Sequence, residues 1–316
     1  GNYSVERIFE DVRAELPADL AVSVQVNSHP SAGISGRLQD AMRAAKVRAD
    51  VRHITGDVHY LAWFMQQRGT LLTILDCVSL ERLEGAKRLL FKKLWYDWPI
   101  ARAQRLTTIS TFSAQSIEAY TGYPASQIDI TPPPVSSEFV RSDRIFNAER
   151  PRVLQVGTSE NKNIDRVIDA LTGLNATLVI VGKLDDRHRE KIRQAGIAFE
   201  SFEGISRQQL IDEYERADIL IFASLYEGFG MPIVEAQAVG RPVITSNVCS
   251  MPEVADDAAL MVDPKNTAEI RHAICELSAN ADLRHSLVAK GFKNARRFSA
   301  SAIAENYAAL YREIAA

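Results

Sequence analysis

The chain has 316 residues, enough for about two domains at roughly 150 residues each. It carries 37 basic and 40 acidic residues, for a net charge of −3, and 46% of its residues are hydrophobic. These values are typical of a folded globular protein. They exclude a disordered, collagen-like or disulfide-stapled chain, and they argue against nucleic acid as the main partner.

Neither a membrane-spanning segment nor an export signal is expected. No apolar run approaches the ~18 residues that a membrane-spanning helix needs, and no charged stretch followed by an apolar one opens the chain. The widely spaced cysteines form no zinc or redox motif and are typical of a reducing compartment. They are Cys77, Cys249 and Cys275. The sequence therefore predicts a cytoplasmic protein.

Short β-branched segments alternate with helical patterns along both halves, which indicates parallel sheets built from strand–helix units. Strands are expected in the first half at Ala21–Asn27, Val51–Thr55, Thr70–Asp76, Leu106–Ser110 and Ile128–Thr131. Strands are expected in the second half at Arg152–Gly157, Ala176–Gly182, Ile197–Phe202, Asp218–Ala223, Pro242–Thr245 and Ala259–Val262. Helices are expected at Tyr3–Leu16, Ile164–Leu171, Arg187–Gln194, Arg207–Arg216, Pro232–Val239 and Thr267–Ala279.

Three consecutive prolines, residues 132–134, open the best candidate for an interdomain linker. Proline lacks a backbone donor and fixes φ, so this stretch favours an extended segment over a helix or a central strand. The predicted organisation is a first domain at 1–132, a linker at 133–150 and a second domain at 151–298. A C-terminal helix at 299–316 completes it, and a return of this helix to the first domain is one option.

The segment after the strand that ends at residue 223 is the most informative for function. Glu227 begins a turn in which Gly228 and Gly230 let the backbone approach a ligand, and Pro232 suits the first turn of the helix that follows. Glu235 is expected in that first turn, so that both carboxylates face the carboxyl ends of the strands. A carboxylate there can accept hydrogen bonds from sugar or ribose hydroxyls. The alternative is that Glu235 complements the helix dipole and Glu227 is a solvated loop residue.

These motifs resemble those of the retaining glycosyltransferases of family 4. The resemblance is most specific in "EGFGMPIVE", followed by "GRPVITSN" and "MPEVADDAALMVDP". Upstream, "VLQVGTSENKNIDRVIDAL", "LVIVGK" and "ADILIFASLYEGFG" match in the same order, and "HITGDVHYLAWF" and "TTISTFSAQSIEAYTG" match more weakly. The family implies the GT-B fold, an α/β architecture of two doubly wound Rossmann-like domains facing across a cleft.

The resemblance also implies roles for particular residues. Glu235 matches the glutamate that binds the donor ribose, Lys162 the lysine that faces the donor diphosphate, and Glu227 the residue that holds the transferred sugar. Other positions matched to the donor site are Gly1, Asn2, Gly157, Gly182, Lys183, Gly204, Gly228, Phe229, Gly230 and Met231. The residues expected to act in catalysis are Glu227, Lys162, His59 and Asp76, the last two on the acceptor side.

Simpler interpretations stay open for several of these residues. Lys162 can be a surface lysine near a helix start, His59 can be packed among its aromatic neighbours, and Asp76 can merely cap the segment that follows its strand. The chain also departs from the family pattern. Leu75 and Thr158 stand where relatives commonly have histidine and arginine, and the family's first strand is expected before Gly1.

The resulting hypothesis is a retaining, metal-independent transferase that moves a mannose- or glucose-type hexose from a GDP- or UDP-linked donor to a saccharide or lipid-linked acceptor. No cofactor is expected, since the chain has no Asp-x-Asp triplet and its six histidines lack metal-ligand spacing. Cell-surface polysaccharide assembly is the expected process. The alternatives are a catalytically weakened nucleotide-sugar-binding protein, a GT-B epimerase or phosphorylase, and a scaffold protein.

A segment rich in lysine and tryptophan, residues 85–105, has two interpretations. Its apolar residues at helical spacing are Leu90, Phe91, Leu94, Trp95 and Trp98, and its basic residues include Lys87, Arg88, Lys92 and Lys93. One interpretation is a helix that packs into the core and keeps its basic side in solvent. The other is a peripheral contact with an anionic membrane, on its inner face, where lipid-linked acceptors lie.

Overall fold

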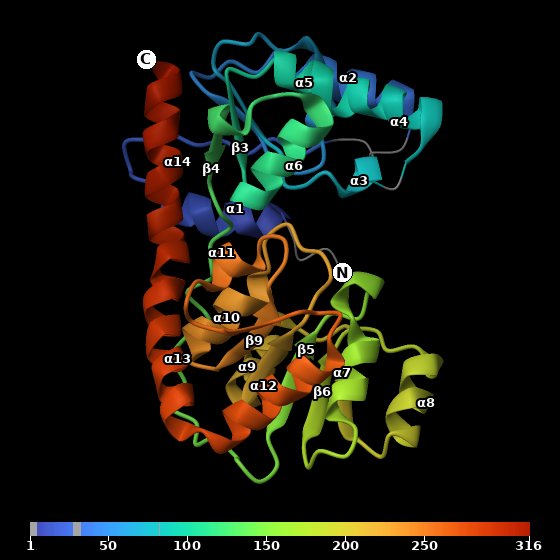
Figure 1. The fold of residues 1–316 in the computed structure, drawn as a ribbon. Helices are drawn as coiled ribbons and strands as arrows, with labels where there is room; N and C mark the ends of the chain where they lie inside the picture. The colour runs from blue at the N-terminus through green and yellow to red at the C-terminus, as the bar shows by residue number, and fades with distance from the viewer. Residues whose placement is uncertain (1–4, 28–32, 82) are drawn as a thin grey trace. The chain divides into compact units, whose positions relative to one another are not determined.

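The computed structural model describes residues 5–27, 33–81 and 83–316, and the chain divides into two compact units (Figure 1). One unit contains the described residues up to Pro134 together with Ala300–Ala316. The other contains Val135–Ser299. Both units have a parallel sheet with helices around it, which confirms the predicted α/β class.

The unit formed by Val135–Ser299 contains a six-stranded parallel sheet in the order β10-β9-β8-β5-β6-β7. Its strands are β5 (Arg152–Val156), β6 (Thr177–Val181), β7 (Ala198–Phe202), β8 (Ile219–Phe222), β9 (Val243–Ser246) and β10 (Leu260–Val262). All six match predicted strands, because runs that are apolar on both faces are what a sheet covered by helices requires. The order reverses direction between β5 and β8, and sheets of this kind bind ligands at the carboxyl ends of such strands.

Five helices of this unit connect successive strands, and two more follow the last strand. They are α7 (Ile164–Leu171), α8 (Asp186–Gln194), α9 (Arg207–Arg216), α10 (Met231–Val239), α11 (Met251–Ala255), α12 (Thr267–Ala279) and α13 (Ala281–Ala295), with 3₁₀ turns η4 (Glu160–Lys162) and η5 (Arg296–Phe298). Helix α7 packs against α8 and α12, and α10 packs against α9 and α13. The core of the unit is aliphatic, with Val153, Ile168 and Ile221 fully buried.

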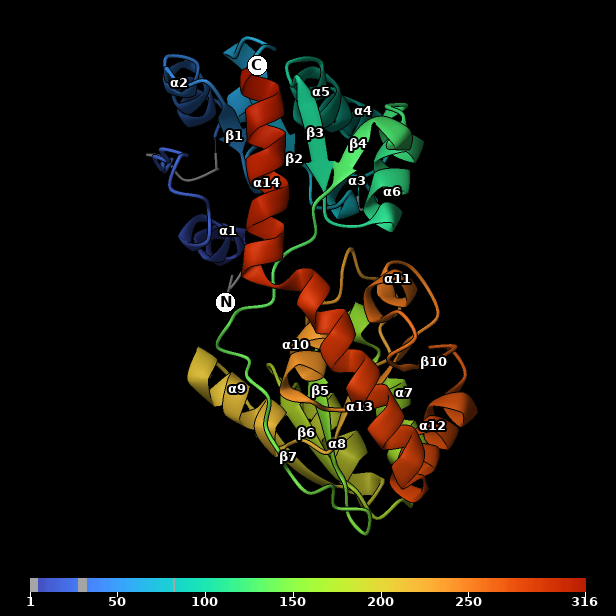
Figure 2. The same cartoon turned by 90° about the vertical axis from the view of Figure 1, so that its left-hand side faces the viewer.

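The other unit contains a four-stranded parallel sheet in the order β1-β2-β3-β4. Its strands are β1 (Arg52–Ile54), β2 (Thr70–Thr73), β3 (Arg105–Thr108) and β4 (Ile128–Ile130). Its helical segments are α1 (Val5–Ala14), α2 (Ile34–Ala44), η1 (His59–Phe64), α3 (Val78–Glu81), α4 (Gly85–Lys92), η2 (Lys93–Asp97), α5 (Trp98–Ala101), α6 (Thr111–Thr121), η3 (Ala125–Gln127) and α14 (Ala300–Ala315). The C-terminal α14 runs alongside this sheet and packs against α1 (Figure 2).

One predicted strand is wrong. Ala21–Asn27 forms no strand, and within the described ranges it pairs with no other segment. Its alternating valines Val22, Val24 and Val26 are 51%, 56% and 80% exposed. A segment with alternating side chains forms a strand only where a neighbouring strand hydrogen-bonds to its backbone. Within the described ranges, Ala21–Asn27 has no such neighbour.

The core-facing interpretation of the lysine- and tryptophan-rich segment is confirmed only in part for its first helix, where the partly buried Phe91 packs against the core and stacks on Trp95 with ring centroids 5.2 Å apart. No residue of α4 is buried, and Leu89 and Leu90 are 68% and 62% exposed. Only where the helix widens into the π-helical turn η2 do Trp95 and Tyr96 enter the core. None of the helices in the described ranges has the length and apolar character that crossing a lipid bilayer requires.

Candidate active site

The residues predicted to bind the donor come together where β5 and β8 end. These strands are neighbours in the sheet, so the turns that follow them lie side by side. The amide of Leu225 donates to the carbonyl of Asn161 (2.7 Å), and the buried Asn163 Nδ2 donates to the carbonyl of Ala223 (2.9 Å). The two turns therefore form one hydrogen-bonded surface at the carboxyl edge of the sheet.

Lys162 and Glu227 form an ion pair at the centre of this surface. Lys162 Nζ lies 2.7 Å from Glu227 Oε1, and Asn161 Nδ2 donates to the same oxygen at 3.2 Å. The ammonium also lies 4.5 Å from the centroid of the Phe222 ring, a cation–π distance. Both charged side chains are mostly buried, with 17% and 15% exposed. Lys162 is therefore held at the strand ends and is not a freely solvated surface lysine.

Two of the predicted glycines are needed for close packing of these turns. Gly157 has φ 90°, and a Cβ there would lie 2.8 Å from Lys162 Cε, so only glycine leaves room for the lysine stem. Gly182 has φ 145°, and a Cβ there would lie 3.0 Å from Thr158 Cγ2. Thr158 Oγ1 donates to the carbonyl of Lys183 at 2.6 Å. Thr158 thus ties together the turns after β5 and β6.

The glycine-rich turn before α10 is held by Ser250, which the sequence analysis did not identify. Ser250 Oγ lies 2.9 Å from the carbonyl oxygen of Glu227 and 2.8 Å from that of Phe229. The buried Phe229 ring packs edge-on against Phe298, with centroids 5.4 Å apart. Gly228 lies between these anchored residues, and the turn therefore has a defined shape in front of Met231, the first residue of α10.

Glu235 is not in the first turn of its helix, and this part of the prediction is wrong. Helix α10 begins at Met231, one residue before the proline that was expected to start it, so Glu235 is the fifth residue. Its Oε2 accepts a hydrogen bond from the Tyr214 hydroxyl at 2.6 Å. Burial raises the pKa of Glu235, while the Tyr214 hydrogen bond and the charges of Arg207 and Lys162 act in the opposite direction. Its electrostatic environment therefore includes Lys162 from the other turn.

The remaining donor-site predictions are placed differently. Gly204 follows β7, at the edge of the sheet and two strands away from β5, and has φ 65°. Gly1 and Asn2 lie outside the described residues.

His59 and Asp76 belong to the other unit, where they line a cavity of about 270 Å³. The other lining residues are Gly56, Asp57, Leu75, Val78, Ser79 and Tyr96. Asp76 Oδ1 accepts from the amide of Val78 at 3.0 Å, so it does cap the start of α3. Leu75 contributes an aliphatic wall where relatives commonly have histidine.

His59 is both packed and part of the cavity wall. It is buried, its ring meets Tyr96 edge-on at 5.4 Å, and its Nδ1 lies 2.9 Å from the carbonyl oxygen of Trp95. A carbonyl only accepts, so Nδ1 carries the proton and Nε2 is the acceptor of the neutral ring. Burial lowers the pKa of His59, against the opposing charges of Asp57 and Asp76. The neutral imidazole is therefore favoured.

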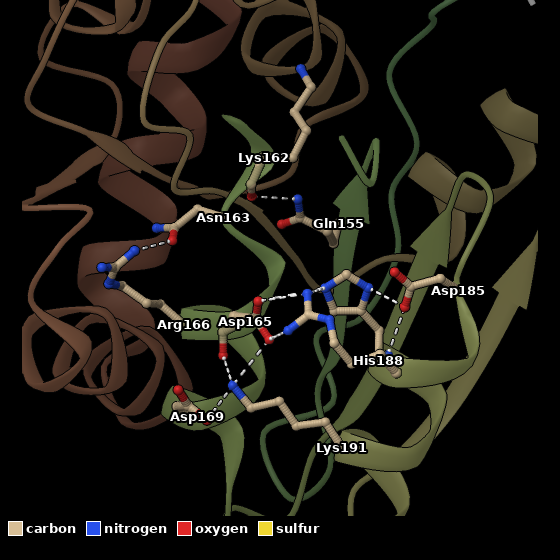
Figure 3. Close-up of polar contacts among 10 residues, drawn as sticks. Gln155, Lys162, Asn163, Asp165, Arg166, Asp169, Asp185, His188 and Lys191 are labelled. Atoms are coloured by element: carbon tan, nitrogen blue, oxygen red, sulfur yellow. Dashed lines mark hydrogen bonds and ion pairs between the residues drawn. The ribbon is translucent and has the colours of Figure 1, made fainter. Parts of the chain in front are cut away.

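Charged side chains join α7 to α8, next in the chain to the turn that carries Lys162 (Figure 3). Asp165 accepts from Arg187 Nη2 at 2.9 Å and from Lys191 Nζ at 3.2 Å, which binds the two helices together. Above them in Figure 3, Gln155 Nε2 lies 3.2 Å from the carbonyl of Lys162. In the ranges that the structure describes, no group of three or more His, Cys, Asp or Glu side chains is arranged to hold a metal ion.

Sequence reasoning missed the polar residues that organise the site. Asn163 has φ 57°, a left-handed conformation that asparagine adopts more readily than most residues, so the "NKN" triplet was an available signal. Gln155 and Ser250 act on backbone carbonyls and have no motif of their own. Tyr214 lies 21 residues before Glu235 and reaches it only through the packing of α9 on α10.

The two parallel sheets, each with helices around it, define an α/β protein with two Rossmann-like units. Residues 136–294, half of the chain, match the family described as Glycosyl transferases group 1. The chain belongs to this family.

Two relatives from Escherichia coli illustrate the match. O-antigen chain mannosyltransferase B is 30% identical in an alignment of 220 positions, gaps included, that covers 62% of this chain and 57% of the relative. The serotype-specific mannosyltransferase WbdA is 24% identical in an alignment of 353 positions, gaps included, that covers 95% of this chain and 42% of the relative. The chain thus spans about half the length of these curated relatives.

Solved structures share the fold at lower identity. Sucrose-phosphate synthase from Thermosynechococcus elongatus is 18% identical with a TM-score of 0.76, and the match covers 98% of this chain and 92% of that one. Anabaena Alr3699/HepE, solved in complex with UDP and glucose, is 14% identical with a TM-score of 0.75, covering 88% and 82%. These likenesses bear out the predicted GT-B fold.

Proposed function

We propose that the protein is a retaining, metal-independent hexosyltransferase of family 4 that uses a nucleotide-diphosphate sugar as its donor. The observation that carries the proposal is the convergence of Lys162, Glu227 and Glu235 at the carboxyl ends of neighbouring strands. A nucleotide-diphosphate sugar has an anionic diphosphate, with hydroxyl groups on the sugar at one end and on the ribose at the other. One cation and two carboxylates that lie close together suit such a ligand. The names of the E. coli relatives favour mannose as the transferred sugar.

Each group has a chemical task in this proposal. The Lys162 ammonium binds the donor diphosphate and stabilises the charge that develops as it leaves. Glu227 and the amides of the turn that follows it hold the hydroxyls of the transferred sugar. Glu235 accepts a hydrogen bond from the donor ribose. Contacts to the nucleotide base are expected to come mostly from the protein backbone. Donors linked to GDP and donors linked to UDP are therefore both to be tested.

The proposed reaction proceeds on one face of the sugar and needs no protein nucleophile. The bond between the anomeric carbon and the phosphate oxygen breaks as the acceptor oxygen bonds to that carbon on the same face. The departing phosphate oxygen takes the acceptor proton. His59, neutral with Nε2 as acceptor, is suited to hold a sugar hydroxyl, while its neighbour Asp76 already serves as a cap. The acceptor is proposed to be a saccharide or a lipid-linked saccharide, in cell-surface polysaccharide assembly.

One observation favours a second function, nucleotide-sugar binding without turnover. Leu75 lines the same cavity as His59 and supplies no hydrogen bond or proton. The protein should be incubated with GDP-mannose or UDP-glucose, with and without oligosaccharide acceptors, while nucleotide release is measured. Release that requires an acceptor and survives EDTA is the expected result. Binding without release supports the second function, turnover without an acceptor indicates an epimerase or phosphorylase, and no binding indicates a scaffold.

We also propose that α4 contacts the cytoplasmic face of an anionic membrane. The helix presents Leu89 and Leu90 to solvent, beside the exposed Lys87 and Lys93, while Lys92 is paired with Asp97 at 2.9 Å. Exposed leucines next to exposed positive charge suit the interface of an anionic bilayer.

Liposome co-sedimentation tests this contact. The double variant Lys87→Gln/Lys93→Gln should bind phosphatidylserine vesicles about 30-fold more weakly, at about 1 kcal/mol for each of the two lysines at the surface. The double variant Lys46→Gln/Lys265→Gln, which removes two exposed lysines elsewhere, is the matched control. Equal partitioning of the unmodified protein to anionic and neutral vesicles would rule the contact out.

A further inference from the structure

A buried tyrosine holds one oxygen of the Glu235 carboxylate. Tyr214 lies on α9, is fully buried, and donates its hydroxyl to Glu235 Oε2 at 2.6 Å. The Phe139 ring packs edge-on against the Tyr214 ring, with centroids 5.5 Å apart and an interplanar angle of 84°. The phenol is thereby fixed in position, and its hydroxyl stays on the carboxylate and away from solvent.

The second oxygen of the same carboxylate is left for another donor. Within the described part of the chain, no hydrogen bond reaches Glu235 Oε1. Burial and the nearby Glu235 charge raise the pKa of Tyr214 well above its usual value, so its hydroxyl stays protonated and remains a donor. The two oxygens of Glu235 therefore have different roles, one bonded within the protein and one able to accept from a ligand.

Helix α9 supplies a second group that acts on Glu235. The charge of Arg207, at the start of α9, favours the ionised carboxylate, as does that of Lys162. Arg207 pairs with Glu138 and lies over the Phe139 ring, with 5.5 Å from its guanidinium carbon to the ring centroid. The same helix thus orients the carboxylate and offsets part of the cost of burying its charge.

We propose that Tyr214 is a positioning residue, which fixes the Glu235 carboxylate so that Oε1 accepts a hydrogen bond from a single hydroxyl of the donor ribose. This inference rests on the proposed function, in which Glu235 contacts that ribose. It adds a specificity element to that contact: the tyrosine takes one oxygen, and recognition of the ribose depends on the other.

The test compares two ligands in two proteins. Dissociation constants are measured by calorimetry for GDP and 2′,3′-dideoxy-GDP, and for the corresponding uridine nucleotides, with the full chain and with Tyr214→Phe. The unmodified protein should prefer the ribose form of the nucleotide that it binds. Tyr214→Phe should reduce this preference about tenfold and leave the affinity for the dideoxy form nearly unchanged, because a hydrogen bond to a charged group is involved.

Tyr311→Phe is the matched control, because it removes another phenol hydroxyl, partly buried and bonded to His53 in the other unit, and should leave the ribose preference intact. If Tyr214→Phe keeps the full preference, the positioning role is overturned. If the unmodified protein shows no preference, the ribose contact of Glu235 is wrong and the inference falls with it. Phe139→Leu, which loosens the Tyr214 ring, should shift the preference in the same direction by a smaller factor, and an unchanged preference there also counts against the proposal.

Discussion

The two units place their polar residues in opposite ways. In the unit formed by Val135–Ser299, Lys162 and Glu227 meet because each belongs to the turn after its own strand and the two strands are neighbours. In the other unit, His53 on β1 lies beneath α14, with Nδ1 2.8 Å from the Tyr311 hydroxyl, 258 residues further along the chain, and Nε2 2.6 Å from Thr73 Oγ1. The first arrangement places polar groups at the carboxyl edge of a sheet, and the second places them between a sheet and a helix.

The difference has an energetic consequence. Burial lowers the pKa of His53 to about 3 and raises that of Tyr307, also on α14, to about 12. The neutral forms of both side chains are therefore strongly favoured, and together with Thr73 they hold α14 on the sheet. Substitutions at the strand ends of one unit should change ligand binding, whereas substitutions beneath α14 should change stability.

The largest effect is expected from Lys162→Met. Removing the ammonium takes away the cation proposed to stabilise the leaving diphosphate, so nucleotide release from the preferred nucleotide sugar should fall about 100-fold, or about 3 kcal/mol. Lys265→Met removes an exposed lysine of the same unit and should leave the rate unchanged. An undiminished rate in Lys162→Met would show that this lysine does not act on the donor, and would weaken the contrast between the units.

An intermediate effect is expected from pH, through His53. The unfolded chain protonates this histidine below pH 6.5 and the folded chain only near pH 3, so its contribution to stability is lost as the pH falls. Between pH 7 and pH 5 the loss should be about 2 kcal/mol, at roughly 1.4 kcal/mol per unit. Urea denaturation of His53→Gln should lack this part of the pH dependence.

His272→Gln, at a histidine whose side chain is 80% exposed, provides the control and should keep the pH dependence of the unmodified protein. Parallel curves for His53→Gln and the unmodified protein would mean that His53 is not buried in its neutral form.

The smallest effect is expected from Gly157→Ala. The left-handed backbone at this position should cost about 1 kcal/mol of unfolding free energy for a residue with a Cβ. The new methyl group also lies where the Lys162 stem packs, so affinity for the donor nucleotide should fall as well. Gly173→Ala has the same backbone strain, with φ 73°, but open space around the added methyl. Equal nucleotide affinity in the two variants would contradict the packing role of Gly157.

Prediction from the sequence was most accurate where segments are structured by their own residues. The strands of the unit formed by Val135–Ser299 follow the expected ranges closely, and α7, α9 and α12 match them at both ends, whereas α11 and α13 were not predicted. Predictions from local patterns were wrong where the structure of a segment depends on a partner that is distant in the chain. Ala21–Asn27 has the alternation of a strand and forms none, and Leu90 has helical spacing toward a core that does not cover it.

In the candidate site too, local motifs predicted some residues and missed those that depend on distant segments. The motif around Glu227 predicted a carboxylate beside Lys162 at the strand ends, and the two side chains do meet there. The motif did not predict that Glu235 lies in the second turn of α10, because the exact start of a helix depends on the preceding turn. The sequence offered no sign of Tyr214.

The sequence alone determined the parallel β/α order, the strand-end turns of the larger sheet and the residues that those turns carry. Apolar runs and glycine turns act locally, so they specify these features without reference to the rest of the chain. Only the tertiary structure decided that α14 buries His53, that Tyr214 holds Glu235, and that α4 keeps its leucines in solvent. Burial and hydrogen-bond partners depend on segments far apart in the chain, and no local pattern records which of those segments will meet.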